Sequence, residues 1–182
     1  MKVHDKAKIV GWTEMRLVDK NGKAKKMFKE NALWRVFHRL FHVDLQIPLL
    51  FGYWTSAVIK RNTITDVGKA VSAGQVNGVT TAPVTAIAIG IGTPSATALG
   101  SESTTNGGER GAATTSRVTT TVTNDTAQWV KTFTFTGALA LTEEGLFDNN
   151  TSGGNMLASQ SFSAVNVVNT DTLQVTHKIK CA

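Results

Sequence analysis

The stretches AQWVKTFTF, residues 127–135, and TLQVTHKIK, residues 172–180, decide the fold class of this chain. In the first stretch, Trp129, Phe133 and Phe135 alternate with polar or smaller residues. In the second, Leu173, Val175, His177 and Ile179 alternate with threonine, glutamine and lysine. Side chains on a β-strand point alternately to the two faces of a sheet, so this period of two predicts antiparallel strands with one buried face. Nothing in the pattern suggests catalytic chemistry.

The alternation extends through the carboxyl-terminal half of the chain and is interrupted by short Gly, Asn and Asp clusters. It predicts a mainly β protein, an antiparallel β-sandwich of Greek-key or jelly-roll type. The expected strands cover residues 84–91, 113–123, 127–136, 139–147, 155–165 and 171–180, and a long polar loop covers 92–111.

The amino-terminal third predicts a β-hairpin followed by one amphipathic helix. Asn21-Gly22 favours a type I′ turn between residues 8–18 and 23–29, because such a turn needs positive φ at both central residues. Asn31 is a suitable N-cap, and Pro48 marks a point beyond which the helix cannot continue. The apolar stripe expected on this helix consists of Leu33, Val36, Phe37, Leu40 and Phe41. The predicted organisation is a basic hairpin and helix at 1–65, a loop or linker at 66–83 and a β-sandwich domain at 84–182.

Charge is distributed unevenly between these parts. Residues 1–61 contain 13 Lys and Arg against 5 Asp and Glu, whereas residues 62–182 contain 6 against 8. This asymmetry suggests that the two parts meet different partners. The single cysteine, Cys181, allows no intramolecular disulfide. We expect no membrane segment, because the longest apolar stretch, 47–54, is far shorter than the ~20 residues of a spanning helix. We also expect no secretory signal, because charges are spread through residues 1–10 and no apolar h-region is present there.

Several short motifs resemble catalytic or binding motifs but lack an essential part. His38 and His42 have the spacing of a zinc-binding helix, but Arg39 stands where a general base would be needed. Gly90 and Gly92 follow an apolar strand as in a dinucleotide site, yet the third glycine and the helix are missing. Glu143 and Glu144 are adjacent, so in a strand they point to opposite faces and cannot flank one scissile bond. We therefore predict no catalytic residue, no cofactor and no metal.

The lysine cluster around the hairpin turn raises the possibility of nucleic-acid contact, because cations there could neutralise phosphates. Phe28 is the only aromatic residue among these lysines, so the segment lacks the interleaved aromatic residues of a stacking platform for single strands. A lysine-rich hairpin that discourages edge pairing explains the cluster at least as well. Nucleic acid is therefore not an expected partner. The lysines are Lys20, Lys23, Lys25, Lys26 and Lys29.

Several short segments, taken in order, resemble virion proteins of tailed bacteriophages. They are AIAIGIGT at 86–93, ALGSE at 98–102, Arg110, Arg117-Val118, LTEEGLFD at 141–148, MLASQSFS at 156–163 and DTLQVT at 171–176. The order is similar to that of a small β-sandwich module in tail-fibre, collar and related structural proteins, and it runs from about residue 84 to 180. The amino-terminal hairpin, with Glu30-Asn31-Ala32-Leu33, is similar to the lead-in of such proteins.

The resemblance implies a non-enzymatic structural component of a virion, made in the host cytoplasm, that assembles with copies of itself and with other head, neck or tail proteins. We expect the apolar helix face and the cluster at 49–54 to form the protein interface. The residues singled out are Trp34, Phe37, Phe41, Leu49, Leu50, Phe51, Tyr53 and Trp54. Alternatives are a capsid decoration protein and a module that binds a host receptor or surface glycan through the loops 93–111 and 149–154. An enzyme such as a depolymerase is the remaining alternative.

Overall fold

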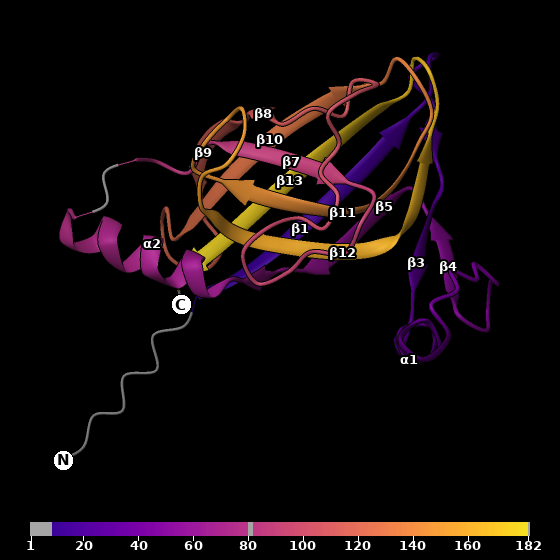
Figure 1. The fold of residues 1–182 in the computed structure, drawn as a ribbon, viewed down its shortest axis with the longest axis horizontal. Helices are drawn as coiled ribbons and strands as arrows, with labels where there is room; N and C mark the ends of the chain where they lie inside the picture. Colours follow the sequence, from indigo (N-terminus) through magenta and orange to yellow (C-terminus); the bar gives the residue numbers. More distant parts are fainter. Residues whose placement is uncertain (1–8, 80–81, 182) are drawn as a thin grey trace.

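The computed structural model describes residues 9–79 and 82–181, which form a two-layer antiparallel β-sandwich (Figure 1). The first sheet contains β1 (Ile9–Val18), β2 (Ala24–Lys25), β5 (Ala57–Arg61), β9 (Thr114–Val118), β10 (Thr126–Thr134) and β13 (Thr172–Cys181). The second contains β6 (Thr63–Ile64), β7 (Ala86–Gly90), β8 (Gly111–Ala112), β11 (Leu139–Phe147) and β12 (Met156–Val167). A separate two-stranded sheet pairs β3 (Met27–Glu30) with β4 (Gly52–Thr55). The helices are α1 (Ala32–Phe41) and α2 (Asp66–Asn77).

The predicted fold class is confirmed. Strands β10 and β13 pair along the first sheet, while the intervening hairpin of β11 and β12 lies in the second, which is a Greek-key type of connection. The alternating apolar residues of β13 and β10 meet those of β11 and β7 between the two sheets. The most deeply buried members of this core are Met15, Ile87, Ile89, Leu141, Leu146, Ala158, Leu173 and Val175.

The amino-terminal strand is part of the sandwich. Strand β1 pairs with β13 over its whole length, from Ile9 opposite Cys181 to Val18 opposite Thr172. Its other edge pairs with β5 and β2, so β1 lies inside the first sheet. The predicted boundary between 1–65 and 84–182 was therefore wrong for the described residues, because strands from both sides of it build the same sheet.

The turn after β1 also differs from the prediction. Gly22 has a φ of 74°, but Asn21 does not have positive φ, so the turn is not of type I′. The carboxylate of Asp19 accepts hydrogen bonds from the backbone N–H groups of Asn21 and Lys23, at 2.9 and 3.0 Å. An aspartate that bonds its own downstream backbone stabilises a different turn from the one that the Asn-Gly pair favours.

Helix α2 replaces most of the predicted linker at 66–83. Thr65 caps the helix by accepting a hydrogen bond from the N–H of Gly68 at 2.8 Å, and Gly78 ends it with a φ of 74°. Gly68 packs so closely on β12 that a Cβ atom there would lie 2.0 Å from the carbonyl oxygen of Leu157. The helix was missed because part of its contact face is made by glycine instead of a periodic apolar stripe.

A buried polar network connects the two sheets. The hydroxyl of Thr13 on β1 donates to the Glu144 carboxylate on β11 at 2.7 Å, and Nδ1 of His177 on β13 lies 3.2 Å from the same carboxylate. Nε2 of His177 contacts the side-chain amide of Asn62. Thr13, Glu144 and His177 are all fully buried. Buried charged and polar groups are tolerated only when they are paired, so these contacts fix the alignment of the sheets.

Replacing Glu144 with leucine should lower the free energy of unfolding by about 3 to 5 kcal/mol, because Thr13 and His177 would then lack their shared partner. The double substitution E144L/H177L should recover part of this loss, since the unpaired imidazole is removed as well. Urea unfolding of wild type, both single variants and the double variant gives the coupling energy. Additive losses would show that the two side chains do not act together.

Candidate interaction surface

The segment from β3 to β4, residues 27–55, folds as a small unit beside the sandwich, and we call it the α1–β4 unit. Figure 1 shows α1, β3 and β4 at the end of the molecule opposite α2. Asn31 is the N-cap of α1, as predicted, and its side chain accepts a hydrogen bond from the N–H of Trp34 at 2.9 Å. The unit has its own aromatic core, made of Phe28, Trp34 and Phe51 with Phe37 and Leu45 against it.

Polar side chains connect the α1–β4 unit to the sandwich. Glu30, which is buried, forms an ion pair with Lys60 on β5 and accepts a hydrogen bond from the Ser163 hydroxyl at 3.1 Å. Lys60 also donates to the carbonyl oxygen of Ser161 at 2.7 Å. Burial is the main cause that lowers the pKa of Lys60; Glu30 opposes this shift and the charge of Arg35 adds to it. The ion pair therefore lies in a partly desolvated position.

A second set of contacts joins the segment after α1 to the edge of β12. The Asp44 carboxylate accepts hydrogen bonds from Nε1 of Trp34 at 3.2 Å and from the backbone N–H of Ala164 at 3.0 Å. Gln46 donates to the carbonyl oxygen of Ala164 at 3.0 Å. These contacts satisfy backbone groups on β12 that no neighbouring strand reaches.

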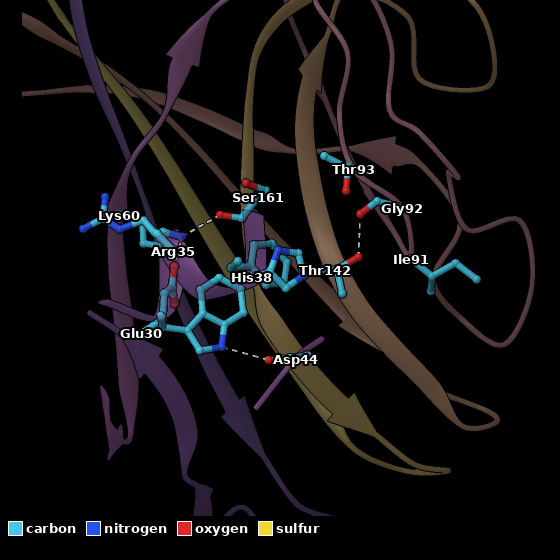
Figure 2. Close-up of a pocket in the computed structure, with 12 residues that line it drawn as sticks. Glu30, Arg35, His38, Asp44, Lys60, Ile91, Gly92, Thr93, Thr142 and Ser161 are labelled. Carbon is cyan, nitrogen blue, oxygen red and sulfur yellow. Dashed lines mark hydrogen bonds and ion pairs between the residues drawn. The ribbon is translucent and has the colours of Figure 1, made fainter. Parts of the chain in front are cut away.

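Between the unit and the sandwich lies a cleft of about 350 Å³. Figure 2 shows Glu30, Arg35 and Lys60 at one side of this cleft and Ile91, Gly92 and Thr93 at the other, with His38 between them. His38 stacks on Trp34 with ring centroids 4.6 Å apart. Among residues 9–79 and 82–181, no three His, Cys, Asp or Glu side chains are grouped closely enough to hold a metal ion.

The α1–β4 unit exposes many large apolar side chains, which together we call the apolar surface. Leu49 is 98% exposed, Leu40 67% and Phe41 60%. Isolated exposed apolar residues are common, but so many on one short unit indicate an interaction site. The apolar surface comprises Leu33, Val36, Leu40, Phe41, Val43, Ile47, Leu49, Leu50, Tyr53 and Trp54.

The structure places the predicted interface residues in two groups. Phe41, Leu49, Leu50, Tyr53 and Trp54 belong to the apolar surface. Trp34 and Phe51 are buried in the core of the unit, and Phe37 packs against that core. In this structure Trp34 and Phe51 are therefore covered by the unit's own core, and the exposed members of the predicted interface are the five residues of the apolar surface. Val43 and Ile47 were missed, since they lie in an irregular segment without periodicity.

A second feature of the sandwich is the buried carboxylate of Glu143 on the outer face of β11. It accepts hydrogen bonds from the backbone N–H groups of Gly92, Gly100 and Ser101 at 3.1, 2.8 and 2.7 Å. A Cβ atom on Gly90 would lie 2.5 Å from Glu143 Oε1, so only glycine leaves room for the carboxylate. The segments at 86–93, 98–102 and 141–148 are thus brought together around one side chain.

Arg110 performs a comparable role in the neighbouring loops. Its guanidinium donates to both Glu102 carboxylate oxygens, at 2.8 and 2.5 Å, and to the carbonyl oxygen of Gly153 at 2.6 Å. It also lies over the ring of Phe147, 3.6 Å from the centroid. Arg110 therefore connects the loop before β8 with the loop between β11 and β12.

Comparison with known proteins gives no further assignment: no family model, curated protein or solved structure matches the chain. In the part of the chain that the structure describes, neither helix is long and apolar enough to cross a membrane.

Replacing Glu143 with glutamine should loosen the loop at 92–101, because the glutamine NH₂ group would oppose at least one of the three backbone donors. We expect hydrogen exchange of the Gly92, Gly100 and Ser101 amides to accelerate at least tenfold, and the free energy of unfolding to fall by about 1 to 3 kcal/mol. Glu109, an exposed glutamate in the same region, supplies the control substitution E109Q. Equal exchange in both variants would contradict the role given to Glu143.

Proposed function

We propose that this chain is a non-enzymatic structural component of a tailed-phage virion and assembles as a symmetric homo-oligomer through the apolar surface of the α1–β4 unit. The observation that carries the proposal is the exposure of that surface, including Leu40, Leu49 and Trp54. A monomer would leave these side chains in water, whereas a ring of identical subunits covers the same patch on every copy.

The arrangement of the α1–β4 unit supports an assembly role. Glu30 and Asp44 attach the unit to the sandwich, so its exposed apolar side chains are held in one orientation. Preorganised apolar residues lose little conformational entropy when they are buried by a partner. The outer strand faces elsewhere are rich in threonine and serine, as in β9, and can pack against further virion proteins without charge repulsion.

The resemblance to virion proteins is supported by the positions of the residues that carry it. Glu143 connects three of the recurring segments, and Arg110 connects Glu102 with the loop that follows Phe147 and Asp148. Their order along the chain thus has a structural reason. Within the virion we propose a place in the tail, the collar or neck, or the fibre attachment. Antibodies raised against the chain should label purified particles at one of these positions.

The double substitution L40D/L49D should convert the oligomer to monomers, because each carboxylate would lose its hydration in the interface. Both side chains are exposed, so the fold should be retained. Light scattering after gel filtration measures the mass, and circular dichroism checks the sheet. V122D, at an exposed valine outside the α1–β4 unit, is the matched control and should remain oligomeric. Monomeric wild-type protein at tens of micromolar would contradict the proposal.

A second candidate function, binding of a host receptor or surface glycan, is favoured by the contacts of Arg110. These contacts hold the loops 93–111 and 149–154 together, so the loops can present one continuous recognition surface. Under this alternative, glycan-array binding by the full chain should be weakened by R110A, which separates the loops, and unaffected by R117A on β9. Absence of any bound glycan would leave assembly as the only proposed function.

A further inference from the structure

A second cleft, of about 470 Å³, adjoins the one shown in Figure 2 and shares Glu30, Arg35, Lys60 and Ser161 with it. It lies where the two sheets separate. Strand β5 pairs with β1 in the first sheet, while β6, two residues further on, pairs with Ala158 and Ser159 of β12 in the second. The chain crosses between the sheets at Asn62, and β5 diverges from the part of β12 beyond Ser159.

The cations of this cleft outnumber its available anions. Lys29, Arg35, Lys60 and Arg61 line it, and Glu30 is its one acidic lining residue. Glu30 is already bonded to Lys60 and Ser163. In residues 9–79 and 82–181, no carboxylate lies within 4.0 Å of the guanidinium of Arg35 or Arg61, and both arginines are exposed. Like charges in a concave site focus a positive potential that attracts anions.

The environment of Lys60 also indicates an excess of positive charge in this cleft. Its ammonium is fixed by Glu30 and Ser161, and the charge of Arg35 is close enough to help lower the pKa of Lys60. An anion between Arg35 and Arg61 would offset this repulsion. The positive charge of the cleft is therefore only partly neutralised by the chain itself.

We propose that this cleft binds carboxylate side chains of an acidic polypeptide segment. A guanidinium presents two parallel N–H donors that match a carboxylate, and Arg35 and Arg61 supply two such groups. The walls are parts of β5 and β12 that have no strand partner on this side, and Ile59 on β5 is 49% exposed. An extended peptide fits into a narrow cleft between strand edges. A DNA duplex instead requires a broad, open surface of cations that can reach its phosphates. The proposal does not depend on self-association through the apolar surface.

The test is a titration of the ¹⁵N-labelled full chain with an acetylated, amidated tetraglutamate peptide, followed by NMR. Shifts should occur at the Nε–H groups of Arg35 and Arg61 and at the backbone of Ser161. The variant R35Q/R61Q should bind the peptide at least tenfold more weakly, and R117Q, which removes an exposed arginine on β9, should bind like wild type. Binding should weaken as salt is raised, since the contacts are ionic.

Three outcomes would overturn the proposal. The first is equal affinity of R35Q/R61Q and wild type for tetraglutamate, with circular dichroism showing that both are folded. The second is equally tight binding of a tetraglutamine peptide, which would mean that charge is not recognised. The third is binding of a 12-base-pair DNA duplex through the same arginines without binding of tetraglutamate, which would assign the cleft to nucleic acid.

Discussion

The burial of two adjacent carboxylates on β11 is the constraint on which the rest of the sandwich depends. Glu143 and Glu144 are both fully buried, and they point to opposite faces of the strand. A buried ion without partners costs several kcal/mol, so each face must supply donors at defined positions. Glu144 takes them from Thr13 and lies against His177 in the other sheet, whereas Glu143 takes them from the loop that follows β7. One pair of residues thus fixes both the stacking of the sheets and the course of the longest loop.

This constraint also explains why the amino-terminal strand belongs to the sandwich. Thr13 lies on β1, opposite His177 of β13, so the hydroxyl and the imidazole reach the same carboxylate from neighbouring strands. A sandwich built only from the strands after residue 84 would leave β13 as an exposed edge and Glu144 short of one donor. The two halves of the chain, which differ in charge, are therefore joined by both strand pairing and a shared polar network.

The sequence predicted the strands from 84 onward because their alternating residues face a single core, and it predicted α1 because Asn31 and an apolar stripe define a helix. It did not predict α2, in which Gly68 makes the closest contact, or β5, which is only five residues long. For the interface, the sequence could not distinguish exposed from buried aromatic residues: Trp34 and Phe41 are both large aromatic residues of the same helix, yet only the fold shows that Trp34 is covered. The role of Glu143 requires Gly92 and Gly100, which are remote in sequence.

The α1–β4 unit combines polar contacts to the sandwich with exposed apolar side chains, so the unit is held in place while those side chains stay uncovered. Its contacts with the sandwich include directional hydrogen bonds through Glu30, Asp44 and Gln46 and the apolar packing of Met27 in the sandwich core, while many of its other large apolar side chains are exposed. Directional hydrogen bonds select one orientation, which nondirectional apolar packing would not. The small aromatic core around Phe28 keeps the unit folded without using the exposed residues. The exposed apolar side chains are consequently available for the proposed assembly contacts, in a geometry that the sandwich determines.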